Sequence, residues 1–386
     1  MFLRKCLRGS VVLILVGLLV ACGAQDPVAE TIVDESAEAV EEVATALPAS
    51  DEEVIEESED EAESEMQPLP DDFTLRIGYI PILGFAPHFV AAERGYFEEM
   101  GLNVEFESFR SGNLMIAPLG QGQIDVGGGN VGPPVFHAVD RGFDIRIVAG
   151  SSSLRPGYGA LPLLVRTELV ESGEVEDAGD LEGRSVAVNV TAGSVEYLVA
   201  EALEPHGLAV DDVDLIPLPF PEMPAAFAND SIDAGILAHP LAGIPLREGD
   251  ATVLLDGGEI TENPQIGVVY FGERLLEPEN REVGVRFLMA YLKAVRDLQG
   301  DAWRENDEIV NALLEWTQVP EPAVRNGVAF YFHPDATINM ESIAEQQQYH
   351  FDRGYTELSE PLPLQEMVNF SYLEEALQRL GEMEEE

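Results

Sequence analysis

Residues 75–97 read Leu-Arg-Ile-Gly-Tyr-Ile-Pro-Ile-Leu-Gly-Phe-Ala-Pro-His-Phe-Val-Ala-Ala-Glu-Arg-Gly-Tyr-Phe, and their pattern indicates an α/β protein. The apolar run Leu75–Ile80 predicts a β-strand, and Pro81–Gly84 predicts a turn. A helix is predicted from about Pro87 to Arg94, where Gly95 ends it. A strand that leads through a short turn into a helix is the unit from which parallel sheets are built.

The same alternation continues along the chain. Further strands are predicted at 102–109, 124–126, 145–149, 185–188, 213–217, 234–237 and 268–271. Helices between them are predicted at 113–120, 135–141, 195–203 and 223–229. Beyond Pro278 the pattern is mostly helical, at 280–299, 305–316, 321–327, 339–353 and 373–381. A glycine-rich break at Pro156–Gly159 divides the alternation, so we expect an α/β protein with two lobes. Its sheets should be mixed but mostly parallel, with a helical C-terminal tail bracing the first lobe.

The N-terminus has the pattern of a bacterial export signal. Arg4, Lys5 and Arg8 precede the apolar run Val11–Ala21, which is short for a membrane-spanning helix. Leu19-Val20-Ala21-Cys22 resembles a lipobox, in which the cysteine thiol takes a diacylglyceryl group. We therefore expect 1–21 to be a lipoprotein signal peptide and Cys22 to anchor the protein to a membrane. The alternative is an ordinary secretory signal in which Cys22 is incidental.

The residues after this cysteine are strongly acidic. The segment 24–72 contains 19 Asp or Glu and no Lys or Arg. Such a segment buries too little apolar area to offset the entropy of ordering it, so 22–72 is expected to be the lipidated cysteine and a disordered tether. The alternative function for this segment is an acidic tail that binds a basic partner.

Composition also limits what the remainder can do. From Phe73 onward the chain has 53 acidic and 18 basic residues, which argues against a nucleic-acid partner. Cys6 and Cys22 are the only cysteines, so this part can form no internal disulfide and no thiolate metal site. We expect neither a metal nor a cofactor.

Several blocks resemble bacterial ABC-importer substrate-binding proteins of the nitrate, sulfonate and taurine type. This branch also includes binders of thiamine-pyrimidine precursors. The blocks are Gly78-Tyr79-Ile80-Pro81, Phe85–Ala91, Arg94–Phe97, Ser111-Gly112, Gly122–Gly129, Asp180–Gly183, Ile232–Ala234 and Phe287–Tyr291. The resemblance covers nearly everything from Phe73 to the C-terminus.

The resemblance implies a two-lobed, periplasmic-binding-protein type II fold that closes on a ligand. Lobe 1 would comprise 73–157 and 268–386, and lobe 2 would comprise 158–267. The hinge would lie near 153–160 and 263–268. The protein would be an extracytoplasmic, membrane-anchored monomer that delivers a solute to an ABC permease and its ATPase.

Ligands of open α/β sheets bind beyond the carboxyl ends of strands, so the turns there contain the candidate site residues. In the first turn, Phe85 could stack on a ligand and His88 could hydrogen-bond it. In the second, the glycine run ending at Gly129 lets backbone amides approach a ligand, and Asn130 adds an amide. Each of these residues could instead serve only packing or local hydrogen bonding.

The third candidate turn contains Ser151 and Ser152, whose hydroxyls could bind a polar head or could only stabilise the turn. Tyr158 follows in the glycine-rich break and would suit an aromatic ligand.

The fourth turn contains Thr191, Gly193 and Ser194 at a predicted helix start, where free amides favour an anion or a carbonyl. Thr191 could equally act as the helix N-cap. In the fifth turn His239 could face the cleft, although a single histidine is often structural.

The ligand class stays open at this point. The resemblance favours a sulfonate, taurine or nitrate, whereas Phe85, His88 and Tyr158 suit a neutral heteroaromatic compound such as a pyrimidine or riboflavin. A ligand sensor for a membrane receptor is a further alternative. An enzyme that makes a thiamine pyrimidine is disfavoured, because that chemistry needs a cleft lysine and Lys293 falls within a predicted tail helix.

Overall fold

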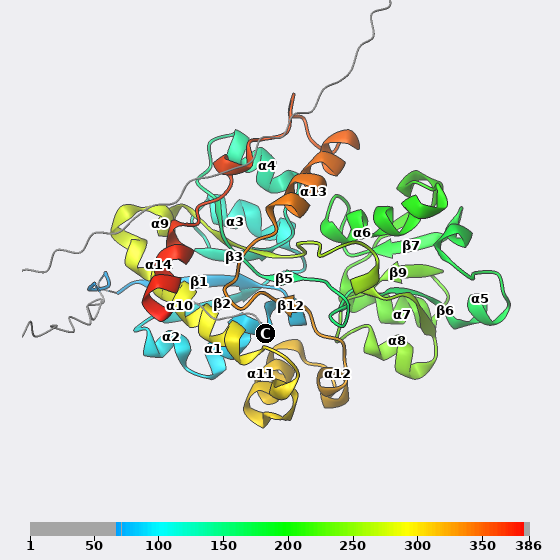
Figure 1. Ribbon diagram of the computed structural model, residues 1–386, viewed down its shortest axis with the longest axis horizontal. Helices are drawn as coiled ribbons and strands as arrows, with labels where there is room; N and C mark the ends of the chain where they lie inside the picture. The colour runs from blue at the N-terminus through cyan, green and yellow to red at the C-terminus, as the bar shows by residue number, and fades with distance from the viewer. Residues whose placement is uncertain (1–66, 71, 382–386) are drawn as a thin grey trace, which may run out of the picture. The chain divides into compact units, whose positions relative to one another are not determined.

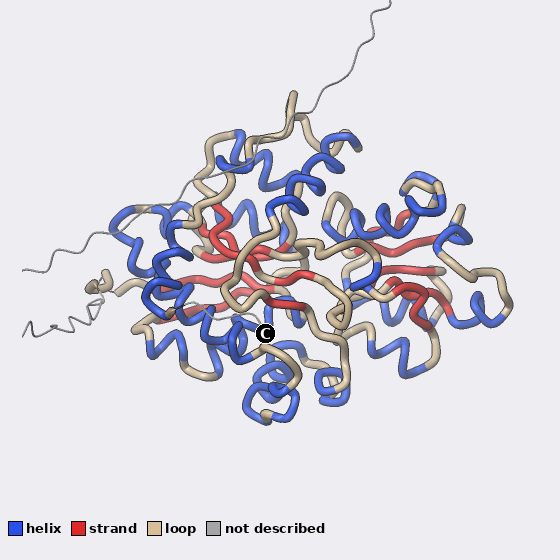
Figure 2. Tube along the Cα trace, in the orientation of Figure 1, coloured by secondary structure: helices blue, strands red, loops and turns tan. Residues whose placement is uncertain are grey.

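The computed structural model describes residues 67–70 and 72–381, which belong to one unit of the chain, Ala62–Glu386. The predicted signal peptide, Cys22 and almost all of the predicted tether lie outside the described residues. Two five-stranded sheets, each with helices packed around it, form two lobes (Figure 1). Figure 2 separates the strands of the two lobes from the helices that surround them. The α/β, two-lobed prediction is confirmed.

The first sheet has the strand order β2-β1-β3-β11-β4. Its strands are β1 (Thr74–Tyr79), β2 (Asn103–Ser108), β3 (Val126–Gly129), β4 (Arg146–Gly150) and β11 (Val268–Phe271). Strand β1 is parallel to both of its neighbours, whereas β11 is antiparallel to both β3 and β4. Four of the five strands therefore run in the same direction.

The second sheet has the order β10-β6-β9-β7-β8. Its strands are β6 (Leu163–Arg166), β7 (Ser185–Val188), β8 (Asp214–Pro217), β9 (Ala234–Ile236) and β10 (Ala251–Leu255). Strand β6 takes the place that β11 has in the first sheet, antiparallel to both neighbours. In each sheet the reversed strand is the one that enters from the other lobe. The sequence analysis missed β6 and β10.

The chain passes from the first sheet to the second between β4 and β6, and returns between β10 and β11. The short strand β5 (Ser152–Ser153) lies on the first of these crossings and pairs with β12 (Tyr331–Phe332) of the C-terminal tail. Ser152 and Ser153 are thus strand rather than turn, which corrects the sequence analysis. The predicted lobe boundaries and hinge segments stay predictions.

The longest helix, α10 (Arg281–Asp297), lies against the first lobe. It buries Val283, Phe287 and Tyr291, whose spacing of four residues places them on one face. Its neighbours include α1 (Ala86–Glu93), α2 (Tyr96–Glu99) and α14 (Ser371–Leu380). Helix α14, at the end of the described chain, therefore packs on α10 of the first lobe.

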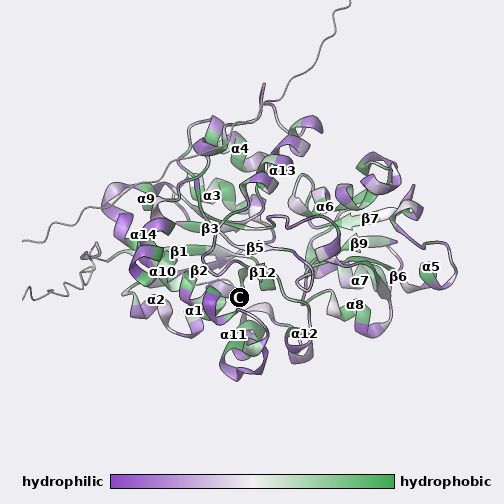
Figure 3. Cartoon of the chain, viewed as in Figure 1, coloured by the Kyte–Doolittle hydropathy of each residue, from purple (hydrophilic) through white to green (hydrophobic). Residues whose placement is uncertain are grey.

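The remaining helices complete both lobes and the tail. They are α3 (Ile116–Gly120), α4 (Pro133–Asp140), α5 (Thr167–Glu171), α6 (Ser194–Leu203), α7 (Met223–Ala228), α8 (Gly243–Glu248), α9 (Glu273–Leu276), α11 (Asp307–Thr317), α12 (Glu321–Arg325) and α13 (Met340–Asp352). Figure 3 shows hydrophobic strands inside and more hydrophilic residues on outer helices such as α13. None of the described helices combines the length and the apolar character needed to cross a bilayer.

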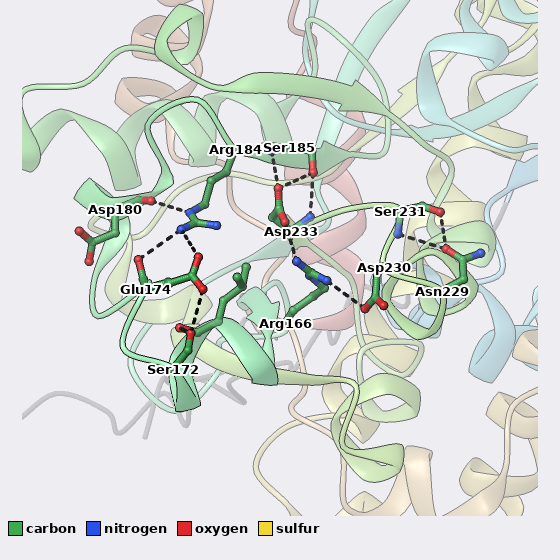
Figure 4. A network of polar contacts seen from close by, with 11 residues as sticks. Arg166, Ser172, Glu174, Asp180, Arg184, Ser185, Asn229, Asp230, Ser231 and Asp233 are labelled. Carbon is green, nitrogen blue, oxygen red and sulfur yellow. Dashed lines mark hydrogen bonds and ion pairs between the residues drawn. The ribbon is translucent and has the colours of Figure 1, made fainter.

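An aspartate precedes the central strand of each sheet. Asp125 lies directly before β3, and its Oδ2 accepts the backbone N–H of Arg76 in β1 at 2.8 Å. Asp233 lies directly before β9, and its Oδ2 accepts the backbone N–H of Ser185 in β7 at 3.0 Å (Figure 4). Arg166 pairs with Asp233 at 3.0 Å. Each carboxylate thus joins the starts of two parallel strands and fixes their register.

Candidate functional site

A cavity of about 50 Å³ lies between residues of the two lobes. A cavity of this size holds the centres of a few water molecules, so it suits a small solute. The lobe 1 side and the segments crossing between the lobes contribute Ile80, Ile82, Gly84, Phe85, Gly112, Gly129, Asn130, Ser151, Ser152, Ile266, Gly267 and Phe330. The second lobe and its entering strand contribute Leu161, Asn189, Ser194, Val195 and Phe220.

Phe85 reaches the cavity because the chain turns sharply after β1, in the 3-10 turn Leu83–Phe85 that precedes α1. Its ring packs on the backbone of β3, where a Cβ at Gly128 would lie 3.0 Å from the ring. Glycine in β3 therefore makes room for the aromatic ring. Residues 127–129 are strand rather than the predicted turn, and only Gly129 among them lines the cavity.

Gly129 and Asn130 end this strand at the cavity. Gly129 has a φ of 130°, and a Cβ there would lie 2.8 Å from the Cα of Gly112. Asn130 donates from Nδ2 to Oδ1 of Asn113 at 3.2 Å, and its carbonyl oxygen accepts the Tyr270 hydroxyl at 2.8 Å. The position of the Asn130 amide is therefore fixed by lobe 1 itself.

Ser151 and Ser152 follow β4 and line the same cavity, as Phe85 and Asn130 do. The Ser151 hydroxyl donates to the carbonyl oxygen of Gly84 at 3.2 Å. The structure thus brings together five of the predicted lobe 1 residues, Phe85, Gly129, Asn130, Ser151 and Ser152, although their roles in binding stay predictions.

On the second lobe, α6 begins at the cavity. Gly193 is its N-cap and has no side chain to cap it, so the first N–H groups of the helix are left for another acceptor. Ser194 and Val195 line the cavity, but Thr191 is exposed and does not. Thr191 also makes no capping hydrogen bond, which corrects the capping alternative of the sequence analysis.

Besides Thr191 and Gly193, three further predicted residues do not line the cavity. His88 lies fully buried behind Phe85, 5.3 Å from it between ring centroids, and burial lowers the pKa of His88 to about 3. Tyr158 packs against Tyr331 with ring centroids 5.5 Å apart. His239 is buried beside Gly327, and burial lowers its pKa to about 4.

Other lining residues were missed by the sequence analysis. Asn189 directly follows β7, so the rule about carboxyl ends of strands could have found it. Its Oδ1 is buried and has no hydrogen-bond partner among the described residues. Phe220 begins the 3-10 turn Phe220–Glu222, Ile266 lies in a crossing segment and Phe330 lies in the tail, and no local pattern indicates that they meet.

The cavity is electrically neutral and mostly apolar. None of the described residues that line it is charged. Its polar side chains are the amides of Asn130 and Asn189 and the hydroxyls of Ser151, Ser152 and Ser194. No cluster of three or more potential metal ligands occurs within residues 67–70 and 72–381. The arrangement can enclose a solute by apolar contact and hydrogen bonds.

Fold and cavity together define a two-lobed protein of the periplasmic binding protein type II class. The nitrate-binding protein NrtA of Synechocystis has this fold, with a TM-score of 0.66 over 81% of this chain and 90% of NrtA, at 17% identity. The desulfurization enzyme DSZB also superposes, with a TM-score of 0.54 over 80% of this chain and 99% of the enzyme, at 20% identity. The fold alone therefore does not separate binding from catalysis.

The family model described as NMT1-like matches residues 69–314, so the chain belongs to the NMT1-like family. A proposed binding protein of Brucella abortus is 30% identical over 177 residues, which are 45% of this chain. The match spans only about half of that relative, 51% of its length. A proposed aliphatic sulfonates-binding protein of Bacillus subtilis is 26% identical over 79% of this chain and 88% of its own.

Proposed function

We propose that this protein is the extracytoplasmic solute-binding component of an ABC importer. One observation carries the proposal: both lobes contribute side chains to one small, neutral cavity at the ends of their strands. A ligand that contacts both lobes stabilises the closed form by the difference in its affinity for the two forms. The permease would then recognise the closed form.

The remaining features of the proposal rest on the sequence. Residues 1–21 would be removed, Cys22 would carry the lipid anchor, and the acidic tether up to residue 72 would let the monomer reach its permease. Lobe 1 would comprise 73–157 and 268–386, lobe 2 would comprise 158–267, and the hinge would lie in the two crossings between them.

The ligand is a small organic or oxyanion solute of the kind named for the relatives, a sulfonate, taurine or nitrate. The cavity volume of about 50 Å³ supports a ligand of this size. A neutral pyrimidine is the alternative, supported by the aromatic side chains of Phe85 and Phe220 that line the cavity. No cofactor takes part, and the ligand leaves chemically unchanged.

Thermal unfolding of the full chain with taurine, alkanesulfonates, nitrate, pyrimidines and riboflavin tests the proposal. A ligand at a hundred times its Kd adds about 2.7 kcal/mol to the free energy of unfolding. Phe85→Ala and Phe220→Ala should each raise the Kd, because each removes contacts from one lobe. Phe143→Ala, at an exposed position, is the matched control. Chemical conversion of a bound compound, or no stabilisation by any of them, would overturn the proposal.

A further inference from the structure

The direction of a serine hydroxyl proton determines whether that serine donates a hydrogen bond to a ligand or accepts one from it. Ser151 Oγ lies 3.2 Å from the carbonyl oxygen of Gly84. A carbonyl oxygen can only accept, so the Ser151 proton points at Gly84. Toward the cavity Ser151 therefore presents lone pairs, which accept hydrogen bonds.

Ser194, on the opposite lobe, is fixed in the same way through Gln346 of α13. The Nε2 of Gln346 lies 2.8 Å from the carbonyl oxygen of Gln265 and 3.1 Å from the Ser342 hydroxyl. Because a carbonyl oxygen needs a donor, the amide orientation of Gln346 is determined. Its Oε1 then lies 2.7 Å from Ser194 Oγ, and Ser194 must donate to it. Ser194, which is only 3% exposed, is thus a second acceptor toward the cavity.

Asn189 provides a third acceptor, because its buried Oδ1 has no partner among the described residues. A buried, unpaired amide oxygen is costly unless a ligand or a water supplies a donor. Ser152 keeps a hydroxyl that can donate or accept. Three of the lining side chains, Ser151, Ser194 and Asn189, thus present acceptors to a ligand, beside the amide donors of Asn130 and Asn189 and the N–H groups at the start of α6.

The negative charge near the cavity also favours a ligand that carries hydrogen-bond donors. Glu196 is fully buried in the first turn of α6, two residues after Ser194. Its carboxyl group accepts the N–H of Ala192 at 2.7 Å and the Tyr349 hydroxyl at 3.0 Å. The whole chain has 72 acidic and 21 basic residues. This field opposes a ligand that brings negative charge without hydrogen-bond donors.

We infer that the ligand carries N–H donors, as an amine, amide or amino-heterocycle does, and directs them to Ser151 Oγ, Ser194 Oγ and Asn189 Oδ1. Gln346 is a positioning residue, because it holds the Ser194 proton away from the cavity. The inference rests on the proposed function and narrows its ligand: taurine fits, whereas nitrate and simple alkanesulfonates lack donors.

Calorimetric titration of the full chain with matched pairs tests this inference. The probes are taurine against ethanesulfonate, and 4-aminopyrimidine against pyrimidine. In a pair that binds, the Kd of the amino compound should be lower by about tenfold or more. This ratio is the effect of one charge-assisted or buried hydrogen bond. Gln346→Ala frees the Ser194 hydroxyl to turn, so the ratio of the two Kd values should fall several-fold. Thr317→Ala is the matched control, because Thr317 is a buried hydroxyl outside the cavity.

The wild-type comparison decides the inference even if Gln346→Ala does not fold. Equal or tighter binding of ethanesulfonate or pyrimidine would overturn the inference and leave the proposed function standing, because a solute is then bound. Binding of neither pair would overturn the inference as well. The proposed function would then depend on the wider set of solutes described above.

Discussion

Asp233 accepts both the backbone N–H and the hydroxyl of Ser185, at 3.0 and 2.9 Å, and thereby joins the starts of β9 and β7. Asp125 does the same for β3 and β1 through the backbone N–H of Arg76. In both lobes, therefore, an aspartate before the central strand accepts a backbone N–H of the neighbouring parallel strand. The two sheets have the same strand order, and the two aspartates lie at corresponding points. In both lobes the dipeptide Ile-Asp lies directly before the central strand. The cavity lies at the opposite, carboxyl end of these strands.

Asp125→Ala should destabilise the protein more than Asp233→Ala. The Asp125 side chain is completely buried and accepts the backbone N–H of Arg76, so its loss leaves that N–H without its acceptor and removes the carboxylate that the Arg76 and Arg274 guanidinium groups share. We expect a loss of about 3–5 kcal/mol in the free energy of unfolding, measured by urea titration. Asp144→Ala removes an exposed partner of Arg146 and should change stability by less than about 0.5 kcal/mol. If Asp125→Ala lowered the free energy of unfolding as little as Asp144→Ala does, Asp125 would not join β1 and β3 as described.

Stability should fall as the pH is lowered from 7 to 4, because of buried histidines. Burial lowers the pKa of His88 to about 3 and those of His239 and His350 to about 4, from an ordinary value of 6.5. Below pH 6.5 the unfolded chain takes up protons that the folded chain does not, so each histidine destabilises the fold progressively. At pH 5 each costs about 2 kcal/mol, and the cost stops growing below the folded pKa.

His350→Phe checks this pH dependence. The aromatic side chain retains the packing near Phe136 and cannot be protonated, so the slope of stability between pH 6.5 and 4 should become shallower. Thr317→Ala, at a buried position without a titratable group, should leave the slope unchanged. Denaturant unfolding at several pH values measures both, and an unchanged slope for His350→Phe would contradict the assignment.

Local patterns predicted most of the elements and several cavity residues. Phe85, Asn130, Ser151 and Ser194 were found because each follows a strand, and the carboxyl ends of parallel strands meet at one edge of a sheet. The helical tail was found because its apolar residues recur at helical spacing.

The missed features depend on contacts between distant segments. Strands β6 and β10 are short apolar runs whose pairing is set by the second sheet rather than by their own sequence. The glycine run before Asn130 has a turn composition, but it forms a strand because Phe85 and Leu119 pack against it. Phe330 reaches the cavity from the tail, roughly 245 residues along the chain from Phe85, which no sequence window can detect.

Gly150→Ala should destabilise the protein substantially. A Cβ at Gly150 would lie 2.2 Å from the carbonyl oxygen of Thr337, a backbone atom that cannot move without shifting the tail. We expect a loss of about 2 kcal/mol or more, measured by urea titration. The control is Gly243→Ala in α8, where the nearest atom, the Cβ of Ala323, is 3.8 Å away. There alanine should be neutral or stabilising by about 0.5–1 kcal/mol, because it favours the helix.

Tyr349→Phe should weaken the attachment of the tail to the second lobe. Tyr349 of α13 donates its hydroxyl to Glu196 of α6 at 3.0 Å, and Glu196 is fully buried. Removing the hydroxyl leaves the carboxyl group one donor short, so the free energy of unfolding should fall by about 1–3 kcal/mol. The neighbouring contact, Arg353 with the exposed Asp211, joins the same two parts of the chain at 2.7 Å.

Asp211→Asn is the comparison for this variant, because it removes a charge from a solvent-exposed pair. It should cost less than Tyr349→Phe and lose its effect in high salt, whereas the effect of Tyr349→Phe should persist there. Urea titrations of both variants at low and high salt separate the two cases. If high salt removes the effect of Tyr349→Phe as it removes that of Asp211→Asn, the Tyr349 hydroxyl does not make a buried hydrogen bond that holds α13 on α6.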